Sequence, residues 1–178
     1  EKLLLYVGDD PRIRAQDVEE VFLDQADSWV FDLTDSVGQR NALRALEHLG
    51  RLLSQGEHPL RLLAPIAAQI RRLLMTRHLI EGEMRQRWTT GMNYNQFQRA
   101  VLKEGAPMIT RHPFREYKSY EEAENFTTGE LLGYLELIYR TDIRLKSSVN
   151  TPRLVMERLI LEMCQGKESM TVGPYAAP

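Results

Sequence analysis

The sequence lacks several features that would assign it to a common class of protein. Its 178 residues contain a single cysteine, Cys164, so an intramolecular disulfide is excluded. No run approaches the ~20 apolar residues that a bilayer span needs. The opening segment turns acidic after a short apolar run, so we expect no signal peptide there. We therefore expect a cytoplasmic protein without a membrane partner, in which Cys164 packs as a small buried side chain.

Catalytic motifs are scarce as well. The sequence has no glycine-rich phosphate loop, no G-x-S-x-G and no H-E-x-x-H. We therefore predict no catalytic residue, no cofactor and no metal site, and we keep an enzyme built from distant residues only as a remote alternative. Surface or capping roles are expected for the four histidines, which lack ligand spacing: His48, His58, His78 and His112.

Charge is distributed unevenly along a nearly neutral chain. The net charge is −2, but residues 1–60 sum to −6, residues 61–118 to +7 and residues 119–178 to −3. The neutral total argues against an autonomous nucleic-acid binder, while the basic middle leaves open a contact with phosphate or with an acidic partner surface. Aromatic residues lie among these arginines and could either stack on bases or fold back onto the protein: Trp88, Tyr94 and Phe97.

Apolar residues recur with helical period, and no long stretch alternates with period two, which predicts an all-α helical bundle. Within the long amphipathic segment 59–82, we expect Pro65 to cause a kink or a restart. The helices expected from periodicity and punctuation are 1–7, 15–24, a short element at 29–37, 39–54, 59–82, a short helix within 95–105, 113–124, 127–146 and 151–165. Val18, Val21 and Phe22 are expected to share one face of the helix at 15–24. The residues expected to face the core in the later helices are Leu43, Leu46, Leu49, Gly50, Leu53, Leu63, Ile66, Ala67, Ile70, Leu74, Leu131, Leu135, Ile138, Leu145, Leu154, Val155, Leu159, Ile160 and Met163.

Local signals also assign structural roles to polar residues. Thr127 and Glu130 have capping-box spacing, and Thr151 precedes a proline as an N-cap does. Asp142 and Lys146 have the spacing of an ion pair on one helix face. The acid pair 121–122 and the arginine pair 71–72 are interpreted as solvated helix edges, although the two arginines could instead grip phosphate.

The order of several short sequences resembles a known family. The matching stretches are "FDLTD" at 31–35, "AL..L..LL..GE.P..LLA.IA.QIR.LL" at 42–74, "HPF" at 112–114 and "L..L...D..LK" within 135–146. Together, over residues 1–165, they resemble the delta subunits of bacterial DNA polymerase III, which belong to the sliding-clamp loader. The stretch 83–111 is longer than the corresponding segment of that family and differs from it in sequence.

The resemblance implies a division into the end of a lid domain (1–26), a helical collar domain (27–166) and a flexible tail (167–178). It implies a non-catalytic scaffold that assembles with other loader subunits in a ring-shaped collar within the polymerase holoenzyme. The sliding clamp would be contacted only through an N-terminal domain preceding this chain, and DNA contact would be weak or indirect. Our candidates for partner contact are Arg61, Arg71 and Arg72. The alternative is a stand-alone helical nucleic-acid-binding module that uses residues 61–118.

Overall fold

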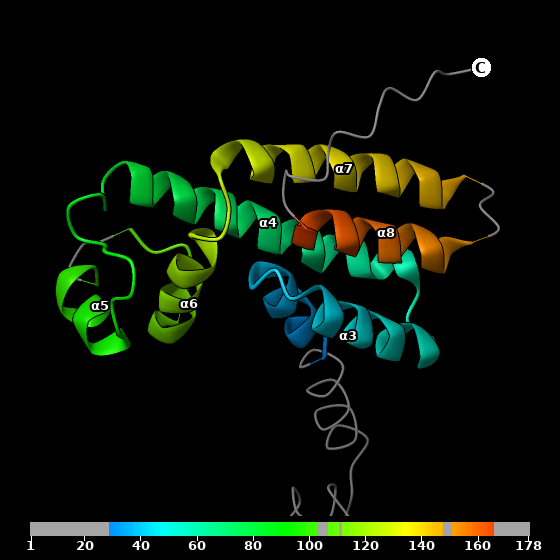
Figure 1. The fold of residues 1–178 in the computed structure, drawn as a ribbon, viewed down its shortest axis with the longest axis horizontal. Helices are drawn as coiled ribbons and strands as arrows, with labels where there is room; N and C mark the ends of the chain where they lie inside the picture. The colour runs from blue at the N-terminus through cyan, green and yellow to red at the C-terminus, as the bar shows by residue number, and fades with distance from the viewer. Residues whose placement is uncertain (1–28, 103–106, 111, 148–150, 166–178) are drawn as a thin grey trace, which may run out of the picture.

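The computed structural model describes residues 29–102, 107–110, 112–147 and 151–165, and among these it contains helices and connecting loops but no strand (Figure 1). The all-α prediction is therefore confirmed for the described part. The helices expected at 1–7 and 15–24 and the tail at 167–178 lie outside it. A helical segment at 29–38 is followed by α3 (Ala42–Ser54), α4 (Pro59–Glu81), α5 (Tyr94–Ala100), α6 (Pro113–Ala123), α7 (Thr128–Lys146) and α8 (Pro152–Gln165).

The long helix α4 is the centre of the fold. It packs against α7 along most of its length and against α6 near its C-terminal half, while α8 packs against both α3 and α7. Figure 1 shows α4 and α7 running in opposite directions, with α8 between α7 and α3 and with α5 and α6 grouped at the other end. The result is a four-helix arrangement with a smaller helical unit attached to one end.

Proline 65 does not break α4. Pro59 occupies the first turn, where its missing N–H costs nothing, and His58 Nδ1 accepts from the backbone N–H of Leu60 at 3.3 Å. The helix then continues through Pro65 to Glu81 without interruption, so the expected restart is wrong. Leu62, Leu63 and Ile66 are all buried around the proline, and this packing offsets the lost backbone bond.

The main core lies between α3, α4, α7 and α8. Most of the expected core positions belong to it, but Leu43 is 70% exposed and Leu154 is 59% exposed, so both of these predictions are wrong. Leu43 lies about 120° around the helix axis from the fully buried Leu49, and Leu154 lies about 160° from the fully buried Met156. Buried residues that the sequence analysis did not name include Ala45, Leu52, Leu62, Leu73, Tyr134 and Met156.

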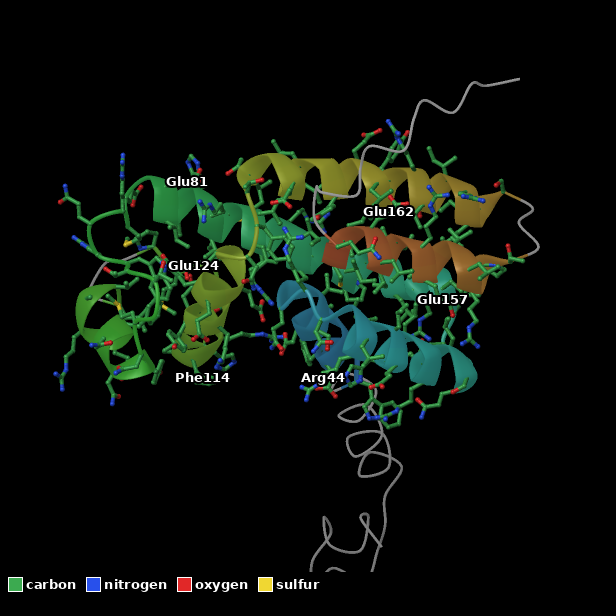
Figure 2. All side chains as sticks on the ribbon, viewed as in Figure 1. Arg44, Glu81, Phe114, Glu124, Glu157 and Glu162 are labelled. Carbon is green, nitrogen blue, oxygen red and sulfur yellow. The ribbon has the colours of Figure 1, made fainter. Side chains whose placement is uncertain are left out.

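A second, aromatic core forms in the part of the chain where the sequence pattern gave the weakest structural prediction. It contains Met84, Trp88, Phe97, Val101, Tyr117 and Tyr120. The Trp88 ring packs against Tyr120 and Phe97, with centroids 5.2 and 5.7 Å apart. Trp88 Nε1 donates to Glu124 Oε1 at 2.7 Å, and Figure 2 labels Glu124 between the second core and α4. The stretch 82–102 therefore folds back onto α6, and Trp88 and Phe97 are not available to stack on bases.

Candidate protein–protein interface

The outer face of α7 carries an exposed row of large apolar side chains. Leu132, Tyr139 and Ile143 are 54%, 60% and 52% exposed. At 100° per residue they fall within about 40° of one another, on the side of the helix away from the buried Leu131 and Ile138. An apolar row that no described element covers is a typical feature of a contact surface for another protein.

Charged side chains border this row. Arg140 Nε donates to Glu136 Oε1 at 2.9 Å, and both side chains are well exposed. Lys146 Nζ donates to Asp142 Oδ2 at 2.6 Å near the end of the helix, so the expected Asp142–Lys146 ion pair is present. Apolar side chains with a polar rim are the usual anatomy of a protein–protein interface.

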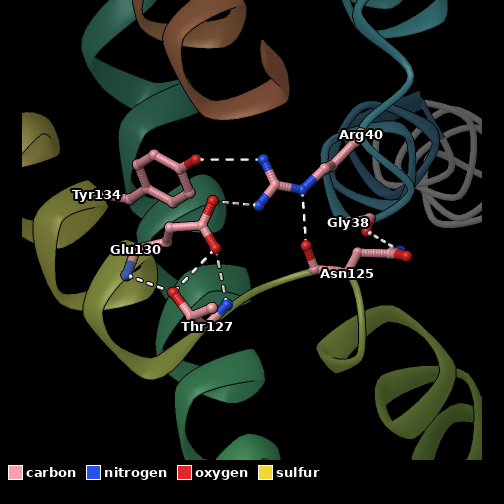
Figure 3. A network of polar contacts seen from close by, with 6 residues as sticks. All are labelled: Gly38, Arg40, Asn125, Thr127, Glu130 and Tyr134. Atoms are coloured by element: carbon pink, nitrogen blue, oxygen red, sulfur yellow. Dashed lines mark hydrogen bonds and ion pairs between the residues drawn. The ribbon is translucent and has the colours of Figure 1, made fainter. Parts of the chain in front are cut away.

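A polar network fixes the start of α7 against the rest of the bundle (Figure 3). Thr127 and Glu130 form the expected capping box, in which each side chain accepts from the other residue's backbone N–H. Glu130 Oε1 also accepts from Arg40 Nη2 at 2.6 Å. Burial raises the pKa of Glu130, but the Thr127 N–H and the Arg40 guanidinium outweigh it, so the pKa lies below the ordinary value.

Arg40 links three parts of the chain. Its Nε donates to the backbone carbonyl of Asn125 at 2.7 Å, and its guanidinium lies 4.3 Å from the centroid of the Phe126 ring. Asn125 Nδ2 donates in return to the carbonyl of Gly38 at 2.9 Å. The turn before α3 is thereby tied to the turn before α7, which orients the outer face of α7 relative to the bundle.

One member of each charged pair, Glu122 and Arg72, does not lie at a solvated helix edge, whereas Arg71 is exposed and Glu121 pairs with Lys118 at the surface. Glu122 is only 5% exposed, so its assignment to a solvated helix edge is wrong. Its Oε2 accepts from Gln69 Nε2 at 2.6 Å, and Gln69 Oε1 accepts from Arg72. Arg72 is half-buried within this network, so the solvated-edge interpretation of Arg72 is also wrong. The reason is tertiary: α6 packs across α4 at this point and covers both side chains.

Burial dominates the electrostatics of this network. It raises the pKa of Glu122 to about 7, and the nearby Asp35 carboxylate acts in the same direction. Gly38 belongs to the contact, because a Cβ at that position would lie 2.7 Å from the Glu122 carboxylate. The absence of a side chain at Gly38 is thus what lets the segment 29–38 approach α6 so closely.

The three candidate arginines do not form one cluster. Arg71 and Arg72 lie side by side in the middle of α4. Arg61 lies near the start of that helix, roughly 15 Å away along the axis, and pairs with Glu57 at 3.3 Å. Whether any of them contacts a partner stays a prediction. The row on α7 was missed by the sequence analysis, although its apolar spacing of seven and four residues could have revealed it.

The described ranges also bear on the expectations for metal ligands, Cys164 and Thr151. No three side chains of His, Cys, Asp or Glu come together there in a way that could hold a metal ion. Cys164 is buried, as expected, and burial raises its pKa to about 11. Thr151 directly precedes the first residue of α8, and its carbonyl accepts from the Val155 N–H at 3.2 Å.

Comparison with known proteins identifies the family of this chain. The family model described as DNA polymerase III delta subunit, C-terminal domain, matches residues 27–163. The chain belongs to this family. The delta family resemblance found in the sequence, with its helical fold, is thus confirmed.

The delta-family chain is similar to a longer curated protein and to a longer solved structure. The DNA polymerase III subunit delta of Bacillus subtilis (strain 168) is 25% identical over 168 residues, which cover 94% of this chain and 44% of that protein. The solved structure of the Bacillus subtilis DNA clamp loader delta protein (YqeN) superposes with a TM-score of 0.58 at 24% identity, covering 92% of this chain and 44% of that one. The chain therefore spans less than half the length of these relatives.

The delta-family helical domain shows no membrane-spanning feature in its described part. None of the helices there has both the length and the hydropathy of a bilayer span. The stretch 83–111, which the sequence analysis had singled out as unusual for the family, contributes Met84, Trp88, Phe97 and Val101 to the second core.

Proposed function

We propose that this chain is the non-catalytic assembly domain of a clamp-loader delta subunit, joined to neighbouring loader subunits through the outer face of α7. The observation that carries the proposal is the row of Leu132, Tyr139 and Ile143, which is exposed and framed by charged pairs. Burying three such side chains contributes several kcal/mol of favourable transfer free energy, which suits a stable contact between subunits.

The partner assignment follows from family membership. The chain belongs to the delta C-terminal family, and one relative is named as a DNA clamp loader protein. We infer that the equivalent helical domains of other loader subunits cover the α7 row in a ring-shaped collar in the cytoplasm. In this proposal the parent complex is the DNA polymerase III holoenzyme, and the sliding clamp is contacted only by a domain outside this chain.

The proposed domain division accompanies this function. Residues 1–26 would close a preceding lid domain, residues 27–166 would form the collar domain, and residues 167–178 would be a flexible tail. The match of the family model to residues 27–163 supports the first and second boundaries. The burial of Trp88 and Phe97 counts against the alternative of a stand-alone nucleic-acid-binding module at 61–118 that stacks bases on these rings.

The proposal is tested by mixing the 178-residue chain with the other loader subunits and measuring the mass of the eluting complex by light scattering. Tyr139→Asp and Leu132→Asp place a charge in the row and should abolish co-elution while leaving the circular dichroism spectrum unchanged. The matched control is Leu43→Asp, which makes the same change at a more exposed leucine on α3. Co-elution that survives both α7 variants, or is never observed, contradicts the proposal.

A further inference from the structure

A groove separates the middle of α4 from the residues that lead into α6. It has a volume of about 530 Å³ and is lined by cationic and apolar side chains. Arg71 and Arg72 contribute from α4, and His112 and Arg115 contribute from the start of α6. No carboxylate is among the described residues that line it. Three arginines facing one groove create a positive potential that an anionic ligand would lower.

The groove continues into an apolar hollow of about 580 Å³. Met75 and Ile109 line both parts, so the two are one continuous surface. Leu74, Leu79 and Met108 add apolar surface to the hollow. Met75 and Met108 are 55% and 42% exposed, and flexible thioether side chains of this kind adapt to ligands of different shapes. The whole surface thus offers cationic groups at one end and aliphatic groups at the other.

A buried carboxylate holds the outer wall of the groove in place. Glu116 is 1% exposed and accepts from the backbone N–H groups of Thr110 and Ile109 at 2.7 and 3.2 Å. These bonds fix the wall against α6, so a ligand would not have to order this segment on binding. Because the Glu116 carboxylate makes these bonds, its charge faces the backbone of Ile109 and Thr110, behind the groove.

The three arginines differ in how many contacts their side chains already make within the protein. Arg72 bonds to Gln69, and burial lowers its pKa while the Glu122 carboxylate behind it raises the pKa. The Arg115 guanidinium lies 4.1 Å from the centroid of the Phe31 ring, an arrangement that fixes its position and leaves its N–H groups free to donate. Arg71 is exposed and has no hydrogen bond or ion pair with any described residue. Arg71 and Arg115 are therefore the two groups that a ligand would use.

We propose that this groove binds a short segment of a partner protein in which acidic side chains are followed by apolar ones. Its carboxylates would accept from Arg71 and Arg115, and its apolar side chains would fill the hollow between Leu74, Leu79 and Met108. Charge complementarity selects the acidic part, and the aliphatic hollow selects a peptide over a nucleic acid. A nucleic-acid strand would meet no Trp, Tyr or Phe ring for base stacking among the described residues that line the two hollows, which hold only the imidazoles of His78 and His112.

The test is fluorescence anisotropy with the 178-residue chain and a fluorescein-labelled peptide that has a run of glutamates followed by leucines. Arg71→Glu and Arg115→Glu should each weaken binding about tenfold or more, because a charge-assisted hydrogen bond becomes a repulsion. Met108→Glu should weaken binding from the apolar end. The matched control, Arg61→Glu, makes the same charge reversal on the same helix outside the groove and should change the affinity less than about twofold.

Three results would overturn the inference. These are the absence of saturable peptide binding, an equal loss with Arg61→Glu, and saturable binding of oligo(dT) but not of the peptide. A peptide with lysines in place of the glutamates should not bind. The groove lies on α4 and α6 and the assembly surface on α7, so this inference goes beyond the proposed function. If the Leu132→Asp variant loses co-elution but still binds the peptide, the assembly surface and the peptide groove are independent of each other.

Discussion

Arg40 Nη2 and Glu130 Oε1 are 2.6 Å apart, although 90 positions of the chain separate the two residues. Arg40 lies in the turn before α3 and has a φ of 54°, a conformation that costs a non-glycine residue about 1 kcal/mol or more. The strained turn is stabilised by what its side chain reaches: a carboxylate, a backbone carbonyl and an aromatic face. The pair thus joins the first and second halves of the bundle.

Removal of this contact should destabilise the fold. Arg40→Ala should lower the free energy of unfolding by about 2–3 kcal/mol, because it leaves the partly buried Glu130 carboxylate without its cation. Arg40→Gly should be less harmful than Arg40→Ala by about 1 kcal/mol, since glycine adopts positive φ freely. Urea unfolding followed by circular dichroism measures both. Arg140→Ala, which removes an exposed ion pair on α7, is the control and should cost less than about 0.5 kcal/mol.

The buried Glu122 predicts a specific pH dependence of stability. Its pKa is about 7 in the folded protein, against 4.5 for the ordinary carboxyl, so the folded state holds a proton that the unfolded chain releases. The free energy of unfolding should therefore fall as the pH rises from about 4.5 to about 7 and then stay level. The groups that surround Glu122 are Gln69, Arg72, Asp35 and Lys118, and Asp35, with its own raised pKa, adds to the same trend.

Glu122→Gln isolates this effect. The amide cannot ionise, so the variant should be more stable than the parent by about 2–3 kcal/mol at pH 8 and should show a flatter profile between pH 5 and pH 7. Urea midpoints measured across this range give the comparison. Glu121→Gln makes the same change at the neighbouring position, which pairs with Lys118 at the surface, and should leave the slope intact. A parent profile that rises with pH would contradict the assignment.

The aromatic core should open without the main bundle. Phe97 is fully buried among Trp88, Tyr117 and Tyr120, and Phe97→Ala should cost about 3–5 kcal/mol through lost burial and the cavity left behind. In a Trp29→Phe background, the fluorescence of Trp88 should shift to the red. Hydrogen exchange should accelerate in α5 and α6 while α3 and α8 stay protected. Phe114→Ala, at a position 56% exposed, is the control with little expected effect.

Cys164 should react slowly in the folded protein. The residue is only 7% exposed, and burial raises the pKa of its thiol to about 11, so at pH 8 the thiol is both protonated and shielded. A disulfide reagent should label it only after the chain unfolds in urea, and the labelling rate in buffer should report on opening of α8. Rapid labelling of the native chain would mean that the packing of α8 against the bundle does not shield the thiol.

Local features of the fold could be predicted from the sequence. The capping box at Thr127 and the break at Gly82 depend on neighbouring residues alone, so they were readable without tertiary information. The burial of Glu122 and Arg72 could not be predicted in this way, because it depends on how α6 crosses α4. Leu43 and Leu154 were misplaced for a related reason: each lies at the start of its helix, where the apolar spacing leaves the buried face undefined.

Prediction of the candidate surfaces from the sequence is limited in the same way, by tertiary packing. The row on α7 follows from helical spacing once Leu131, Tyr134 and Ile138 are known to face inward. The groove beside Arg71 depends on residues 107–110, which Glu116 holds in place from another element. No pattern within α4 alone could have shown that Arg71 and Arg115 face a common space.

The attachment of α5 and α6 at one end of α4 has a consequence for how such domains can diversify. α5 packs chiefly on α6, and the aromatic core is separate from the packing of α3 against α8. Insertions between α4 and α6 can therefore accumulate over evolutionary time without disturbing the register of the main bundle. Two domains of this kind could keep the same main bundle while differing in the appendage that they display beside it.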